Sequence, residues 1–192
     1  MYERVIKRLL DVTFAILLLL VLIIPMLIIA IIVKTTSKGP VLFVQERFGK
    51  NSRKFNLLKF RSMQVNAPLV SNQHFDMVQA HVTTFGKVMR ELSLDELPQV
   101  LNVLLGQMSF IGPRPLAESD LRVIELRRKT GADRVKPGIT GWAQVNGRNN
   151  LDDEHKAAFD KEYSDDVSFK NDVKIVVLTI VNVIAKTGIN AD

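Results

Sequence analysis

The sequence predicts an α/β fold in which a mostly helical single domain surrounds a small sheet and follows an apolar N-terminal helix. The chain has 192 residues and is 47% hydrophobic, which is enough for one domain with a buried core. Residues 12–33 form a long run without a charged side chain. Two short stretches typical of strands, residues 41–45 and 55–60, lie among segments whose apolar residues recur at helical spacing.

The uncharged run over residues 12–33 has the length of a membrane helix. As a straight helix it would be about 33 Å long, close to the thickness of a bilayer core. The run is too long for a cleavable signal peptide. Pro25 lies inside it, so a kink is expected there, and basic residues flank both ends, so the positive-inside rule gives no orientation. A kinked helix that spans the bilayer and a helix that bends at Pro25 and returns to the same face both fit this pattern.

Turn residues and helical spacing divide the rest of the chain. Helices are expected over residues 85–91, 97–105, 116–130 and 151–163. Loops are expected over residues 64–79, 112–115 and 137–150, which are rich in proline, glycine or asparagine. The very apolar residues 173–184 fit a core helix, a strand or a helix on a membrane surface.

Charge and cysteine content limit the classes of function. The formal net charge is +6, which favours anionic partners such as lipid head groups, phosphates or nucleic acid. Nucleic acid is disfavoured because no aromatic platform lies within a basic patch. The chain has no cysteine, which excludes disulfides, zinc–thiolate sites and cysteine nucleophiles. No P-loop, dinucleotide fingerprint or Ser-His-Asp set is present.

The stretch from Ser93 to Gln99 carries two adjacent carboxylates, Asp95 and Glu96, with Arg90 just upstream. A carboxylate can attack phosphorus to form a covalent intermediate, or it can hold a divalent cation. The same residues have a purely structural interpretation. Ser93 and Glu96 have the spacing of a capping box, and Asp95 could cap a helix whose first turn contains a proline. The pattern alone leaves both interpretations open.

Several basic residues are candidates for binding phosphate. Lys59 and Arg61 alternate on an expected strand, so both side chains are predicted to point to one face. Arg90, Arg114 and Arg148 each lie near a glycine, a proline or a helix end, and arginine binds phosphate through two parallel hydrogen bonds. A solvated surface charge is the alternative for each, although two flanking prolines restrict Arg114.

Together these motifs resemble the monotopic phosphoglycosyl transferases, also called bacterial sugar transferases, in their minimal form. The match follows the family order along nearly the whole chain. The matching motifs are Gln45-Glu46-Arg47-Phe48-Gly49, Lys59-Phe60-Arg61-Ser62-Met63, Ser93 to Gln99, Met108 to Pro115 and Pro137 to Arg148. The chain departs from the family pattern at Ile24, where serine is frequent, and at Thr84, where a basic residue is frequent.

The resemblance implies an activity at the start of exopolysaccharide or glycoconjugate synthesis. Such enzymes use Mg²⁺ and transfer a sugar-1-phosphate from a UDP-sugar to polyprenyl (undecaprenyl) phosphate, releasing UMP. It assigns the catalytic roles to Asp95 and Glu96, with Asp95 as nucleophile and metal ligand. The substrate-binding residues that it implies are Lys59, Arg61, Arg90, Arg114, Gln144 and Arg148.

The resemblance also implies a location. Residues 1–34 would form a re-entrant helix that bends at Pro25, and residues 35–192 would form a catalytic domain on the cytoplasmic face of the membrane. Amphipathic surface helices would lie on the membrane lipids, and other enzymes of glycan assembly are further candidate partners. Two alternatives remain at this point: a non-catalytic membrane-anchored module that binds anions, and a Mg²⁺-dependent hydrolase of UDP-sugars.

Overall fold

The computed structural model describes residues 1–64, 81–147 and 151–185. Most of these residues are helical, and the strands form small sheets, as expected from the sequence. The helices are α1 (Lys7–Thr36), α3 (Thr84–Glu91), α4 (Gln99–Leu104), α5 (Leu121–Thr130), α6 (Trp142–Val145), α7 (Asp153–Asp165) and α8 (Phe169–Ile184). The strands are β1 (Leu42–Phe48), β2 (Lys54–Phe60), β3 (Ser109–Ile111) and β4 (Gly138–Thr140).

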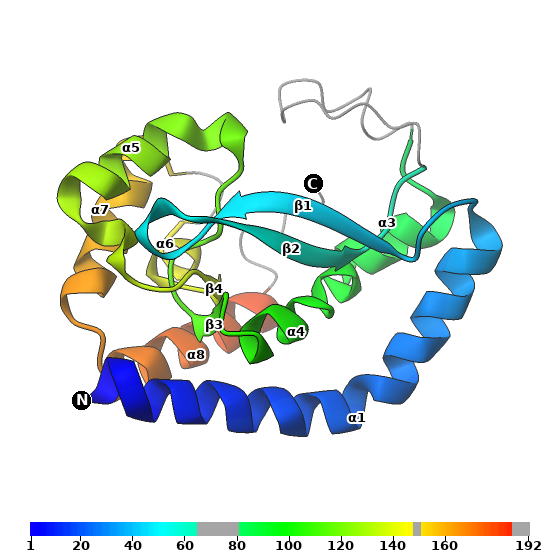
Figure 1. The fold of residues 1–192 in the computed structure, drawn as a ribbon, viewed down its shortest axis with the longest axis horizontal. Coiled ribbons are helices and arrows are strands. Elements are labelled where there is room, and N and C mark those ends of the chain that lie inside the picture. The colour runs from blue at the N-terminus through cyan, green and yellow to red at the C-terminus, as the bar shows by residue number, and fades with distance from the viewer. Residues whose placement is uncertain (65–80, 148–150, 186–192) are drawn as a thin grey trace.

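The strands form two separate pairs rather than one sheet. β1 and β2 are an antiparallel hairpin whose register runs from Leu42 opposite Phe60 to Phe48 opposite Lys54. β3 and β4 form a short parallel pair. The hairpin crosses the middle of the molecule, with α4, β3 and β4 below it and α5 and α7 at one end (Figure 1). The hairpin therefore extends across the domain from one end towards the other.

Helix α1 is bent, and both of its halves pack against the same domain. It runs along the base of the molecule and then turns upward towards β1 (Figure 1). Pro25 lies inside the helix. In the first half, Ala15 packs with Leu57 and α4; in the second half, Ile29 and Val33 pack in a core with Phe60 of β2. The domain thus fills the inner angle of the bend. A proline inside a helix is expected to produce such a bend.

The outer side of α1 is apolar and exposed. In the described part of the chain, one helix is long and apolar enough to cross a membrane, and it covers Tyr2–Thr36. Its exposed large side chains include Phe14, Leu17, Leu20, Val21, Ile24, Leu27, Ile28 and Ile31. An exposed apolar surface of this size on one helix fits contact with lipid better than contact with water.

Charged residues near the start of α1 are buried and paired with the domain. Lys7 Nζ lies 2.6 Å from Asp172 Oδ2 of α8, and the Tyr163 hydroxyl donates to the other oxygen of Asp172 over 2.8 Å. Asp11 accepts a hydrogen bond of 3.0 Å from the Ser109 hydroxyl in β3. Because buried charges are costly unless paired, these contacts fix the first turns of α1 to the domain.

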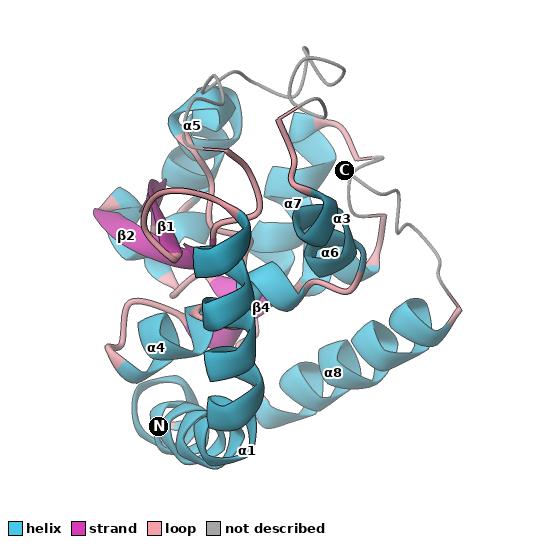
Figure 2. Cartoon of the chain, turned by 90° about the vertical axis from the view of Figure 1, so that its right-hand side faces the viewer, coloured by secondary structure: helices cyan, strands magenta, loops and turns pink. Residues whose placement is uncertain are grey.

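Helix α8 resolves the alternatives left open for residues 173–184, because the segment is a helix with one buried side. Its first turn lies near the start of α1 at the base of the molecule, and the helix then runs away from α1 (Figures 1 and 2). Asp172 and Ile175 face the domain. Its exposed apolar side chains are Phe169, Val173, Val176, Val177, Ile180, Val181, Val183 and Ile184. This exposure contradicts a core helix and agrees with a helix on a membrane surface.

Several boundaries differ from the sequence prediction. The helix expected from residue 97 begins at Gln99, and the helix expected from residue 116 begins at Leu121 after a short 3-10 turn. The loop prediction for residues 137–150 was wrong where β4 and α6 form. Residues 65–79 of the other expected loop lie outside the described residues.

Candidate active site

Asp95 and Glu96 lie on a 3-10 turn, Leu94–Glu96, between α3 and α4. Ser93 precedes this turn with a φ of 55°, a left-handed conformation that is uncommon for a residue other than glycine. Its side chain makes no capping hydrogen bond, and α4 begins after Pro98 without a side-chain cap. The capping interpretation of this stretch was therefore wrong, and both carboxylates are available for other contacts.

The turn is anchored by its apolar residues to the second half of α1. Leu94 and Leu97, on either side of the carboxylates, pack in the core that contains Ile29, Val33 and Met89. Because this half of α1 also carries exposed apolar residues, the Asp95–Glu96 dyad lies next to the surface that would contact lipid.

Glu96 is held by β2. Lys59 Nζ lies 2.8 Å from Glu96 Oε1, and both side chains are partly buried. Burial alone would raise the pKa of Glu96, but the charges of Lys59 and Arg114 and a hydrogen bond with Gln99 outweigh it and hold that pKa below its usual value. Glu96 is therefore ionised and fixed in position at neutral pH.

Asp95 has a different environment from its neighbour. It is 8% exposed, and burial raises the pKa of its carboxyl above the usual value. The charge of Lys59 opposes this rise, the charge of Glu96 adds to it, and Arg90 opposes it again. In the described part of the chain, no basic side chain lies within ion-pair distance of Asp95. Two adjacent carboxylates thus differ in pKa and in partners, which is a pattern typical of catalytic sites.

The structure brings three of the sequence-predicted basic residues towards the dyad. Lys59 contacts Glu96 directly, and Arg114 acts on Glu96 through its charge. Arg90, on α3, is near enough to Asp95 to lower its pKa, and its Nε donates to the Ser62 hydroxyl over 3.0 Å.

The other candidates have different positions. Arg61 directly follows β2, and its buried guanidinium donates to the Ser37 carbonyl over 2.8 Å. Gln144, in α6, donates to the carbonyl of Ile139 over 3.3 Å. Arg148 lies outside the described residues. Substrate-binding roles for these three residues stay predictions.

Comparison with known proteins agrees with this site. The sequence matches the bacterial sugar transferase family over residues 2–186. The chain belongs to this family. It is 42% identical to the uncharacterized sugar transferase EpsL of Bacillus subtilis (strain 168), over 96% of this chain and 90% of EpsL. The dyad is therefore the candidate active site of a sugar transferase.

Two further relatives have names that state an activity, and this chain spans less than half of each. It is 42% identical to the UDP-glucose:undecaprenyl-phosphate glucose-1-phosphate transferase of Escherichia coli (strain K12), over 93% of this chain and 40% of that protein. It is 37% identical to the UDP-galactose-lipid carrier transferase of Erwinia amylovora, over 97% of this chain and 42% of that protein. The two names specify different sugars.

The dyad of this sugar transferase suits a cation that takes one ligand from the protein and others from the substrate. Mg²⁺ is commonly bound by one or two carboxylates together with substrate phosphates and water. Asp95 offers a carboxylate without a basic partner, whereas Glu96 is engaged by Lys59. Across residues 1–64, 81–147 and 151–185, no three acidic or histidine side chains converge into a complete metal site. A cation held by Asp95 would therefore take its other ligands from substrate and water.

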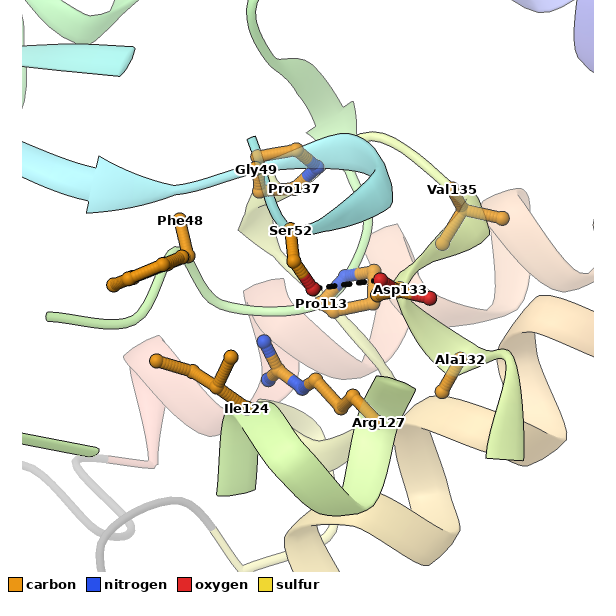
Figure 3. Close-up of a pocket in the computed structure, with 10 residues that line it drawn as sticks. All are labelled: Phe48, Gly49, Ser52, Pro113, Ile124, Arg127, Ala132, Asp133, Val135 and Pro137. Carbon is orange, nitrogen blue, oxygen red and sulfur yellow. Dashed lines mark hydrogen bonds between the residues drawn. The ribbon is translucent and has the colours of Figure 1, made fainter. Parts of the chain in front are cut away.

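The loop that carries Arg114 is fixed by hydrogen bonds from Arg127 of α5. Arg127 Nη1 donates to the Arg114 carbonyl over 2.9 Å, and its Nε donates to Asp160 of α7 over 2.7 Å. Figure 3 shows the Arg127 guanidinium in a small pocket beneath Pro113, where the Ser52 hydroxyl donates to Asp133. Sequence reasoning missed Arg127, because its spacing does not distinguish it from other charges on α5.

Arg47 is a second functional candidate that received no role from the sequence. It belongs to the motif that matches the family at residues 45–49, and it lies in β1 close enough to Arg114 and Glu96 to be affected by their charges. Its place in the matched motif over residues 45–49 was the signal that could have identified it.

Proposed function

We propose that this protein transfers a sugar-1-phosphate from a UDP-sugar to polyprenyl phosphate, giving a polyprenyl diphosphate sugar and UMP. The observation that carries the proposal is a buried carboxylate, Asp95, without a basic partner among the described residues and adjacent to a carboxylate that Lys59 already engages. The activities named for the relatives from Escherichia coli and Erwinia amylovora support this reaction class. In bacteria the acceptor would be undecaprenyl phosphate, and the product would start an exopolysaccharide or glycoconjugate.

Asp95 is the nucleophile in this proposal. One carboxylate oxygen attacks the phosphorus that bears the sugar, and the bond from that phosphorus to the oxygen of UMP breaks. UMP leaves with the electron pair, and an aspartyl phosphosugar remains. A phosphate oxygen of the polyprenyl phosphate then attacks the same phosphorus and releases the Asp95 carboxylate. No proton has to be removed from the acceptor, because its phosphate is already an anion.

The neighbours of Asp95 support these two steps in different ways. Glu96, fixed by Lys59, orients groups around the phosphates rather than acting as a strong base. Arg90 and Arg114 offset the negative charge that accumulates on the diphosphate. Mg²⁺ held by Asp95 and the substrate phosphates would neutralise phosphate charge when bound. A buried nucleophile whose pKa lies above its usual value also stays more basic, which favours attack.

The membrane has a direct role in this proposal. The bend of α1 and the packing of both its halves on one domain support a re-entrant helix over residues 1–34 and a catalytic domain over residues 35–192 on the cytoplasmic face. The exposed apolar sides of α1 and α8 would lie in the lipid. Because the acceptor phosphate stays at the head-group level, an active site fixed there gains encounter frequency and orientation.

The test is UMP release by detergent-solubilised protein with Mg²⁺, undecaprenyl phosphate and a panel of UDP-sugars, with Asp95→Asn as the matched variant. The expected result is UMP release that requires the lipid, yields a lipid-linked sugar and is lost in Asp95→Asn. UMP release without a lipid-linked product would instead support a hydrolase. Retained binding of anions without turnover would support a non-catalytic module. The panel is needed because the relatives use different sugars.

A further inference from the structure

The register of the β1–β2 hairpin places Arg47 on the strand face that carries Lys59. Phe43 lies opposite Lys59, Gln45 opposite Leu57 and Arg47 opposite Phe55. Cross-strand partners share a face, and side chains two residues apart on a strand point the same way. The Lys59 side chain on this face reaches Glu96. Arg47 therefore points to the face of the hairpin from which the dyad is contacted.

The end of β1 is also tied to the loop that carries Arg114. The Phe48 amide donates to the Leu116 carbonyl over 2.8 Å, and the two side chains pack in one core. Arg47 is the residue before Phe48, and Arg114 lies two residues before Leu116. This contact places Arg47 and Arg114, from distant parts of the sequence, near enough for their charges to interact, and the charge of Glu96 in the dyad also acts on Arg47.

In the described part of the chain, no acidic side chain lies within ion-pair distance of either guanidinium, although the charges of Asp120 and Glu96 act on Arg47. Arg47 Nε and Nη2 both donate to the neutral Gln45 Oε1, over 3.2 and 2.7 Å. Asp120 lies nearby, but one of its oxygens accepts the amide of Ala117 over 2.9 Å. Burial lowers the pKa of Arg47, and the charge of Arg114 lowers it further. Arg47 is half-buried and Arg114 is exposed, and an anion bound by both would offset their mutual repulsion.

We propose that Arg47 and Arg114 together bind one phosphate group of a substrate, with Gln45 orienting the guanidinium of Arg47. This inference rests on the proposed function, because it assumes phosphate-bearing substrates at the dyad. Guanidinium groups pair with phosphate through parallel, charge-assisted hydrogen bonds, and Gln45 holds one edge of Arg47 so that Nη1 points away from it. The phosphate belongs either to the diphosphate of the UDP-sugar or to the polyprenyl phosphate.

The experiment compares Arg47→Gln, Arg47→Lys and Gln45→Ala with wild type, using the full-length protein in detergent. KM is measured separately for the UDP-sugar and for undecaprenyl phosphate, and UMP binding is measured by calorimetry. Arg128→Gln is the control, because Arg128 is an exposed arginine in the last turn of α5. Thermal unfolding confirms that each variant is folded.

Arg47→Gln is expected to raise one of the two KM values by about 10- to 100-fold, the range of a lost charge-assisted hydrogen bond. Arg47→Lys keeps the positive charge but lacks the two parallel N–H donors of a guanidinium, so its KM should lie between those of wild type and Arg47→Gln. Gln45→Ala should raise the same KM by a smaller factor. A change in the KM of the UDP-sugar with weaker UMP binding assigns the donor; a change in the KM of undecaprenyl phosphate alone assigns the acceptor. Both KM values within about twofold of wild type in folded Arg47→Gln and Arg47→Lys would overturn the inference.

The binding measurement separates this inference from the proposed function. If wild type releases no UMP from any sugar but binds UMP, and Arg47→Gln weakens that binding, the proposed reaction fails while the phosphate site stands. If wild type turns over and Arg47→Gln changes neither KM nor UMP binding, the reaction stands and the phosphate site fails.

Discussion

Lys59 and Glu96 form an ion pair of 2.8 Å between β2 and the turn that carries the dyad, and this contact separates the two adjacent carboxylates in pKa. Glu96 has a lowered pKa because Lys59 and Arg114 outweigh its burial, whereas Asp95 has a raised pKa because burial outweighs Lys59. These opposite pKa shifts are expected to affect the pH dependence of turnover.

Replacing Lys59 by methionine is expected to move the acid limb of kcat/KM to higher pH. Lys59 lowers the pKa of Asp95, so its loss raises that pKa and less of the nucleophile is ionised at a given acidic pH. Glu96→Gln should move the limb to lower pH, because the charge of Glu96 raises the pKa of Asp95. UMP release across a pH series measures both. Shifts in the same direction for the two variants would contradict the assignment of this limb to Asp95.

Asp95→Asn is expected to raise the melting temperature at neutral pH while abolishing turnover. The pKa of Asp95 is higher in the folded protein than in the unfolded chain, so the folded protein binds the proton more readily. The free energy of unfolding therefore falls as pH rises from the usual carboxyl pKa to the raised pKa of the folded state. Above that window the ionised, buried carboxylate destabilises the fold, and asparagine removes this cost. Below the usual carboxyl pKa the difference should vanish. Thermal unfolding in detergent tests this, with the exposed Glu125→Gln as control; a lower melting temperature at neutral pH would be the opposite result.

Arg127→Met is expected to lower the free energy of unfolding by about 3–5 kcal/mol, because it leaves Asp160 buried without its partner. The double variant Arg127→Met/Asp160→Leu should recover most of this loss, since it removes both buried charges. Denaturant unfolding measures each value. A single-variant loss below about 1 kcal/mol would show that this pair does not hold the Arg114 loop in place.

A re-entrant α1 places both of its ends on the cytoplasmic face. The chain has no cysteine, so single cysteines report position without background labelling. Arg4→Cys and Lys38→Cys, both at exposed positions flanking α1, should resist a membrane-impermeant maleimide in intact cells and react after lysis. Glu125→Cys, which lies in the domain, serves as the reference for labelling on the side of the membrane where the domain lies. Labelling of only one of the two flanking positions in intact cells would indicate a spanning helix.

The sequence predicted the elements of this fold better than the contacts of the site. Apolar spacing located β1, β2 and α3 within a few residues, because local periodicity determines them. The ion pair between Lys59 and Glu96 joins residues 37 positions apart, and no local pattern indicates it. Arg61 was expected to face the same way as Lys59, but its guanidinium is engaged by the Ser37 carbonyl 24 positions away, a contact that no local pattern indicates.

The stretch from Ser93 to Glu96 was ambiguous for a physical reason. The spacing of a serine and a glutamate is identical in a capping box and in this 3-10 turn, and only the backbone distinguishes them. Ser93 adopts a left-handed conformation that turns its side chain away from a capping role. Such conformations in residues other than glycine are frequent at functional sites, but the residue type does not reveal them.

In the proposed reaction Asp95 carries a covalent phosphosugar, which intact-protein mass spectrometry can detect. Protein incubated with its UDP-sugar and Mg²⁺, without acceptor, should gain the mass of one sugar phosphate, and added undecaprenyl phosphate should remove it. Asp95→Asn should gain nothing, whereas Arg128→Gln should behave as wild type. An active enzyme that shows no adduct, or an adduct that persists in Asp95→Asn, would contradict covalent catalysis by Asp95.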